Sequence, residues 1–355
     1  MRGRIRNQLM DKKQDFHYGG QAVIEGVMMR GPKNFAVAVR RAGGEIVVTA
    51  ENVETMFAKL AWLKKPFLRG TFVLIDALTL GIKALKYSTD IAMQDIAAEE
   101  AGSSESPQAP ALTDAERADA SPPKAVNDIA INAMLVLGLI IGLAFFILVP
   151  IIFTRMLNTH VHTRWQLTTA EGLLKIALFV GYVCAISMLR DIRRVFQYHG
   201  AEHKTINAFE AGVDLEVDKV MNHTKVHVRC GTSFILVVLV ANIVVYALIG
   251  DHLPRGSLLE RGFVNNLIRW AYHIALLPVV AGLAYEIIRF AGNCKDSMFT
   301  KLILLPGLLM QKITTREPEP AMVEVAIKSL QAVLDKENAE CATRSEGNLN
   351  CENAK

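Results

Sequence analysis

Long apolar runs constrain the fold of this chain more than any other feature. The first run, residues 129–153, reads IAINAMLVLGLIIGLAFFILVPIIF and contains no charged residue. At about 1.5 Å per residue, a helix of this length crosses a hydrocarbon core of about 30 Å. Backbone amides inside a bilayer need internal partners, so such runs are predicted to be helices. Three more runs follow, at residues 172–189, 232–250 and 267–291.

The expected fold class is an α-helical integral membrane protein with about four transmembrane helices plus a small α+β cytosolic N-terminal unit. That unit is expected because β-branched residues between Gly, Pro and Asn turns indicate strands in residues 17–53. The segments expected along the chain are a basic tail (1–16), the α+β unit ending in an amphipathic helix (17–97), a disordered linker (98–128), a membrane domain (129–335) and a disordered tail (336–355).

Two segments are open to more than one interpretation. Residues 71–90 carry a narrow polar face and a broad apolar one, which fits either a helix lying on the bilayer or a helix packed on the spans. Residues 301–313 are apolar and fit either an interfacial or a partly re-entrant segment. The sequence alone decides neither case.

Basic residues predict the orientation in the membrane. Lys and Arg are concentrated before residue 14, in the loop 190–231 and after residue 294, so both termini and this loop are expected in the cytosol. The net charge of +4 is explained by this topology and requires no nucleic-acid partner. The expected partners are the lipid bilayer and either a second copy of the chain or another membrane protein.

The loop 190–231 contains two pairs of metal-binding residue types. His199 and His203 are four residues apart, so on a helix both rings project from one face. His227 and Cys230 form the second pair, and the 23 residues between the pairs allow the chain to fold back. Imidazole together with thiolate favours zinc over magnesium or calcium. The alternative is that the first pair is only the solvated face of a helix beside the membrane.

Glu202 raises the question of catalysis. The residues HGAEH match the inverted zincin pattern His-x-x-Glu-His, in which the glutamate activates a zinc-bound water. Inverted zincins also use a downstream carboxylate, and Glu210 is too close along the chain for that role. The His/Cys pair predicts a different coordination, so a protease is not favoured. A closed shell of three His and one Cys would be structural.

Five separated blocks of the sequence are distinctive; they are GGQAVIEGVMMRGP (19–32), FLRGTFVLIDALTLGIKAL (67–85), FQYHGAEHKTINAFE (196–210), HVRCGTSF (227–234) and ITTREPE (313–319). Together and in this order they resemble the YqhQ-like family of bacterial integral membrane proteins, a family of unknown function described as containing predicted metal-dependent enzymes. The resemblance covers residues 17–335. Val228 stands where the family often has proline, and the acidic linker is longer than usual, but neither departure removes a candidate ligand.

The resemblance implies a location in the bacterial cytoplasmic membrane and a metal site at His199, Glu202, His203, His227 and Cys230. It also implies that Glu25 and Arg30 belong to a shared functional surface. From spacing alone, these two residues would be taken for an ordinary hairpin with surface charges.

Three functions follow from these features. The leading hypothesis is a zinc-dependent membrane enzyme of hydrolytic type, with His199, His203 and Cys230 as ligands and His227 as a fourth ligand or as a partner that contacts one of the ligands. In this hypothesis Glu202 is the general base, while Glu25 and Arg30 orient the substrate. The alternatives are a metal-stabilised membrane scaffold or assembly factor and, less favoured because four spans are few, a transporter.

Overall fold

The computed structural model describes residues 18–53, 68–103, 128–157, 163–227, 229–249, 275–288, 290 and 298–352. Its strands are β1 (Gly19–Val23), β2 (Gly26–Arg30), β3 (Asn34–Arg40) and β4 (Ile46–Asn52). Its helices include α2 (Leu68–Ser103), α4 (Asp128–Leu157), α5 (Arg164–Ile186), α6 (Arg190–Glu210), α7 (Val217–Met221), α8 (Gly231–Ile249), α10 (Met298–Thr314) and α11 (Pro320–Glu352). The predicted basic tail (1–16) and residues 104–127 of the predicted linker (98–128) lie outside the described residues.

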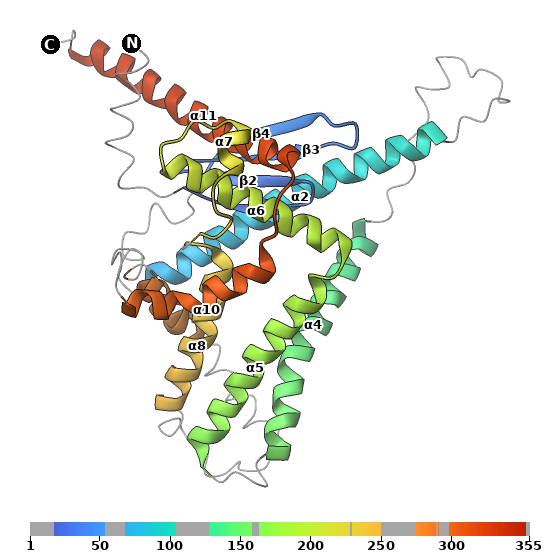
Figure 1. Cartoon of the computed structure of the whole chain (residues 1–355), viewed down its shortest axis with the longest axis vertical. Coiled ribbons are helices and arrows are strands. Elements are labelled where there is room, and N and C mark those ends of the chain that lie inside the picture. Colours follow the sequence, from blue (N-terminus) through green and yellow to red (C-terminus); the bar gives the residue numbers. More distant parts are fainter. Residues whose placement is uncertain are drawn as a thin grey trace. The chain divides into compact units, whose positions relative to one another are not determined.

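The chain divides into two compact units. The larger unit is drawn from residues 1–95, 180–241 and 255–355, and the smaller one from residues 96–179 and 242–254. The larger unit contains the sheet, α6, α7 and α11, and it is the one that carries the candidate site (Figure 1). In the smaller unit, Gly172 of α5 meets the side chain of Ile243 of α8 at close range.

The strands form one antiparallel sheet in the order β1-β2-β3-β4. Its first hairpin is tight, because Val23 pairs with Gly26 and only two residues connect them. The second of these two residues, Glu25, has a φ of 49°, an uncommon conformation for a residue with a side chain. A charged side chain is thereby held at the tip of the hairpin.

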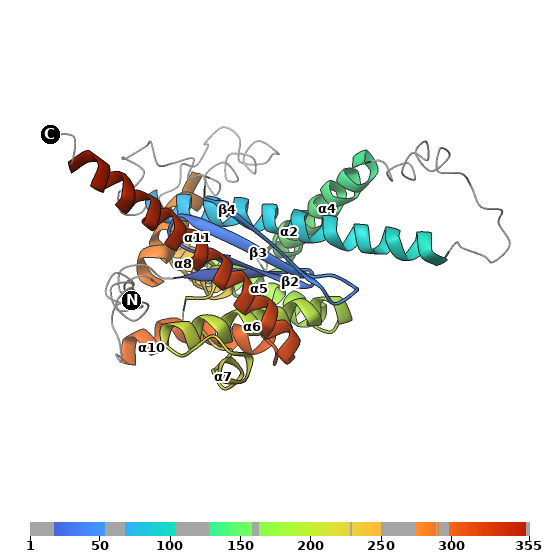
Figure 2. The ribbon, with the colours of Figure 1, turned by 90° about the horizontal axis from the view of Figure 1, so that it is seen from above.

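Alternate residues of the strands face opposite sides of the sheet, which gives the unit two apolar cores. Val27 and Met29 of β2 join the core with α6 and α11, whereas Met28 joins the core with α2. This alternation follows from the two-residue period of a strand. The sheet therefore lies between α2 on one face and α6 with α11 on the other, as Figure 2 shows.

Two glycines let α6 approach its neighbours closely. A Cβ added at Gly200 would collide with the carbonyl oxygen of Arg316, in the connection between α10 and α11. A Cβ added at Gly20 of β1 would lie 2.8 Å from Cγ of Glu202. The Arg316 amide also donates a hydrogen bond of 2.9 Å to the carbonyl of Phe196. These contacts fix the buried face of α6 against β1 and against the start of α11.

The prediction of four transmembrane helices is wrong for the described residues. Among them, a single helix, Trp165–Ile186, is long and apolar enough to cross a membrane. The other apolar stretches found among the described residues are shorter; they are Val136–Pro150 within α4, Phe234–Val245 within α8, and Ala275–Ile288. Part of the fourth predicted run, residues 267–274, lies outside the described residues.

The segment 71–90 lies inside α2 and turns its polar residues toward the sheet. Asp76 pairs with Arg30 of β2, and Lys83 pairs with Glu51 of β4. Large apolar residues of α2 are exposed; they are Val73, Leu74, Ile75, Leu78, Ile82, Leu85, Met93 and Ile96. Residues 301–313 belong to the helix α10. At the other end of the chain, α11 continues beyond residue 335, to Glu352.

Substitution of Gly200 by alanine tests the close approach of α6 and the α10–α11 connection. We expect Gly200→Ala to cost about 1–3 kcal/mol of stability, because the new methyl group meets a backbone carbonyl that a side-chain rotation cannot move. Gly181→Ala in α5 is the matched control, since no atom lies within 4 Å of its added Cβ. Thermal unfolding of the purified chain measures both, and equal midpoints would contradict the prediction.

Candidate metal centre

Helix α6 presents the first histidine pair on its buried face. His199 and His203 are one turn apart, and their ring centroids are separated by 4.4 Å. His203 is 1% exposed, and Glu202 between the two histidines is 3% exposed. The four-residue spacing places both rings on the same side, as a helical period of 3.6 residues requires.

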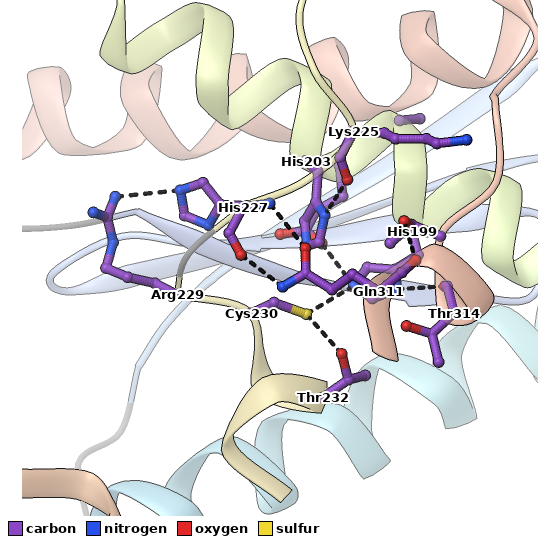
Figure 3. A network of polar contacts seen from close by, with 12 residues as sticks. His199, His203, Lys225, His227, Arg229, Cys230, Thr232, Gln311 and Thr314 are labelled. Atoms are coloured by element: carbon purple, nitrogen blue, oxygen red, sulfur yellow. Dashed lines mark hydrogen bonds and ion pairs between the residues drawn. The ribbon is translucent and has the colours of Figure 1, made fainter. Parts of the chain in front are cut away.

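Cys230 completes a cluster with these two histidines. Its Sγ lies 3.3 Å from Nε2 of His199. One ligand atom from each of His199, His203 and Cys230 lies within 4.8 Å of the other two, so this His/Cys cluster can hold a metal ion. Figure 3 shows the cysteine sulfur directed toward the histidine rings from the start of α8.

The second nitrogen of each ring is bound to a backbone carbonyl. Nδ1 of His199 lies 2.9 Å from the carbonyl of Thr314, and Nδ1 of His203 lies 2.7 Å from that of Lys225. Because a carbonyl oxygen only accepts, each Nδ1 donates the hydrogen, and in the neutral ring this leaves the lone pair on Nε2. Metal-bound histidines are typically oriented in this way by an outer partner. Both rings are therefore prepared to bind an ion through Nε2.

Cys230 lies directly before α8, beside the first turn of that helix. Its Sγ lies 3.1 Å from Oγ1 of Thr232, and its carbonyl accepts the amide of Phe234 in the first turn of α8. The sulfur is thus placed at the positive end of a helix of 19 residues. A thiolate is the form of cysteine that binds metals.

Glu202 adds a carboxylate beside the two histidines. Its Oε2 lies 3.8 Å from Nε2 of His199 and 3.8 Å from Nε2 of His203. Burial raises the pKa of Glu202, while the two histidines His199 and His227 and the amide of Gly20 act in the opposite direction. A bound cation would also favour the charged carboxylate. Glu202 is therefore positioned as a base at the edge of the cluster.

His227 lies next to the cluster but is held by other partners. Its ring centroid is 5.7 Å from that of His203, and its Nε2 lies 3.6 Å from Oε2 of Glu210 and 3.4 Å from Nη2 of Arg229. The side-chain amide of Gln311 accepts the His227 amide at 2.9 Å and donates to its carbonyl at 2.7 Å. The ligand atoms of His227 are not part of the group formed by the His/Cys cluster.

Glu25 and Arg30 make their contacts with other groups. The Glu25 carboxylate accepts two hydrogen bonds of 2.6 Å from the guanidinium of Arg194 and one of 3.2 Å from the hydroxyl of Tyr198. Burial, followed by the charge of Glu25, raises the pKa of Tyr198. Arg30 pairs with Asp76 of α2. Their role in orienting a substrate stays a prediction.

Four contacts of this site were missed from the sequence. Three of them are made by backbone groups of Gly20, Lys225 and Thr314. A contact made by a backbone group cannot be recognised from the type of residue at that position. The fourth, Gln311, could have been found, because it is an amide side chain at the end of the apolar stretch LILLPGLLM. An amide side chain that is buried with such a stretch needs hydrogen-bond partners, so its presence predicts a specific contact.

Comparison with known proteins gives two matches. The family described as "Protein of unknown function (DUF1385)" matches residues 65–336. The chain is 33% identical over 321 residues to "Uncharacterized protein YqhQ" of Bacillus subtilis (strain 168), covering 89% of this chain and 92% of that protein. No solved structure matches the chain.

Removal of the Gln311 side-chain amide tests its two hydrogen bonds to the backbone of His227. We expect Gln311→Leu to destabilise the chain by about 1–3 kcal/mol for each of the two buried His227 backbone groups left without a partner. Gln94→Leu is the control, because Gln94 makes an exposed contact with Arg41. Denaturant unfolding compares the two variants, and a Gln311→Leu chain as stable as the control would refute this assignment.

Proposed function

The chain belongs to the YqhQ-like family, described as proteins of unknown function (DUF1385), and we propose that it is a zinc-dependent enzyme of hydrolytic type. The observation that carries the proposal is the arrangement of Glu202 beside the His/Cys cluster. Three ligand atoms converge within 4.8 Å, and a buried carboxylate lies 3.8 Å from two of them. This arrangement combines a set of metal ligands with a base.

The donor set supports zinc as the metal. Two imidazole nitrogens and one thiolate are soft to borderline ligands, which zinc prefers and magnesium and calcium do not. Catalytic zinc sites typically use three protein ligands and keep a fourth position open. The His/Cys cluster supplies three ligands, because the His227 ring contacts Glu210 and Arg229.

A hydrolytic reaction fits the position of Glu202. A zinc ion bound at the cluster would supply a Lewis acid that makes a water molecule acidic near neutral pH. Glu202 would accept the proton from the attacking water at its carboxylate and return it to the leaving group. Among the three ligands the cluster is most open at His199, whose side chain is 13% exposed. We therefore expect a small substrate that approaches from this side.

A structural metal site is the second candidate function, and one observation favours it. The His227 ring lies near that of His203, with centroids 5.7 Å apart. If His227 turned from Glu210 to the ion, the shell would close with four protein ligands and Glu202 would have no water to activate. The protein would then be a metal-stabilised scaffold or assembly factor for a partner in the membrane.

The proposed setting is the cytosolic face of the bacterial cytoplasmic membrane. One helix, Trp165–Ile186, has the length and composition of a membrane span, which is compatible with membrane association. The exposed apolar residues of α2 would also lie favourably against lipid. The basic residues that follow α5 support a cytosolic location for the end of this helix and for the site that follows it.

Metal analysis of the purified chain tests the proposal. The wild type is expected to contain about one zinc per chain, whereas His203→Ala loses it because one of three ligands is gone. His223→Ala is the matched control, since His223 lies in the same loop and is not part of the cluster. A wild-type chain without transition metal, prepared without chelators, would overturn the proposal.

Replacement of zinc by cobalt distinguishes the enzyme from the scaffold. The cobalt protein is expected to show a sulfur-to-metal absorption band that disappears in Cys230→Ser, because Cys230 supplies the sulfur. In an open site, azide binds the metal and changes the visible spectrum. In a closed site, azide changes nothing, which would favour the scaffold over the enzyme.

A further inference from the structure

A basic pocket lies where α6 begins, away from the His/Cys cluster. Its volume is about 470 Å³, and it is lined by Met188, Arg190, Arg193, Arg194, Gln197 and Glu319. Three of these residues are arginines, and Glu319 is the single carboxylate among them. Such a lining favours an anionic ligand, because guanidinium groups bind carboxylate and phosphate in a fixed, forked geometry.

Two of the arginines are available to a ligand. Arg194 is engaged by Glu25, with both hydrogen bonds at 2.6 Å. Arg190 and Arg193 make no ion pair with any residue in the described part of the chain. The lining therefore retains an excess of positive charge after the Glu25 and Glu319 carboxylates are taken into account.

The start of α6 adds backbone donors to the same place. Leu189 precedes the helix and makes no side-chain capping bond, so the first turn has amides without a side-chain partner. A helix N-terminus with such amides favours a bound anion. Asp191 in this turn acts against an anion, but it does not line the pocket.

The position along the chain identifies the source of the anion. Ile186 ends the candidate membrane span, and the pocket begins two residues later. Met188 is 84% exposed and Leu189 is 57% exposed at this junction. Exposed apolar side chains followed by unpaired arginines are typical of the boundary between acyl chains and lipid headgroups.

We propose that the arginine pocket binds the phosphate of an anionic phospholipid at the end of α5. Arg190 and Arg193 donate to the phosphate oxygens, while Met188 and Leu189 contact the acyl chains. The proposal rests on the membrane association proposed above. It is independent of the metal, since none of the lining residues belongs to the His/Cys cluster.

Native mass spectrometry of the full chain tests this site by counting bound lipids. We expect phosphatidylglycerol to bind more tightly than phosphatidylcholine, and Arg190→Gln with Arg193→Gln to weaken phosphatidylglycerol binding by about tenfold or more. Arg190→Lys with Arg193→Lys retains the charge but loses the forked geometry, so binding should be intermediate. Lys33→Gln with Lys86→Gln removes the same charge from exposed residues outside the pocket and should bind like the wild type.

Several outcomes would overturn the proposal. Equal phosphatidylglycerol binding by wild type and the Arg→Gln variant would exclude the pocket. If the Lys33/Lys86 control lost binding equally, the effect would be net charge and not this site. Complete competition by inorganic phosphate, without any preference for phosphatidylglycerol over phosphatidylcholine, would assign the pocket to a free phosphate.

Two parallel measurements separate this proposal from the proposed function. A wild-type chain absent from the membrane fraction of cells would refute membrane association itself, whatever the pocket binds. The thermal unfolding midpoint of the Arg→Gln variant is expected to equal that of the wild type. An unchanged midpoint shows that the variant has folded, whether or not the chain binds zinc, so a loss of lipid binding then reports on the pocket alone.

Discussion

Helix α6 buries consecutive polar side chains, and the rest of the larger unit is arranged to give them partners. Glu202, His203, Lys204 and Thr205 are all buried. Burying a neutral polar group without a hydrogen bond costs about 2–7 kcal/mol. Lys204 donates to the carbonyl of Met221 at 2.7 Å and lies 2.6 Å from a carboxylate oxygen of Glu317. Glu202, His203 and Lys204 thus each require a particular segment to lie beside them, whereas the Thr205 hydroxyl donates to the Ala201 carbonyl within α6.

This requirement explains why segments distant in sequence meet at the His/Cys cluster. The carbonyl that holds His199 comes from the end of α10, the one that holds His203 comes from the loop after α7, and the amide beside Glu202 comes from β1. The glycines at 20 and 200 remove the side chains that would otherwise prevent this approach. The cluster is therefore a product of the fold and does not depend on one local motif.

The sequence predicted the local parts of this site better than the distant ones. The i, i+4 spacing of His199 and His203 determines their shared face, and Cys230 is the softest ligand in the same loop. The orientation of His227 depends on Gln311, 84 residues away, and spacing carries no information about such a contact. Hydropathy along the sequence predicted four spans, whereas a single helix of the described residues, Trp165–Ile186, has the length and composition of a span. The strands of residues 19–52 follow turn signals that are local, and these were predicted.

The coordination of the metal in the purified full chain is the decisive measurement for a zinc site at the His/Cys cluster. X-ray absorption at the zinc edge reports the number and type of ligand atoms without any knowledge of the substrate. A zinc ion at the His/Cys cluster would have one sulfur at about 2.3 Å and nitrogen or oxygen atoms at about 2.0–2.1 Å, with the sulfur contribution lost in Cys230→Ser. A shell without sulfur in the wild type, or a shell that keeps its sulfur in Cys230→Ser, would contradict a zinc site at this cluster.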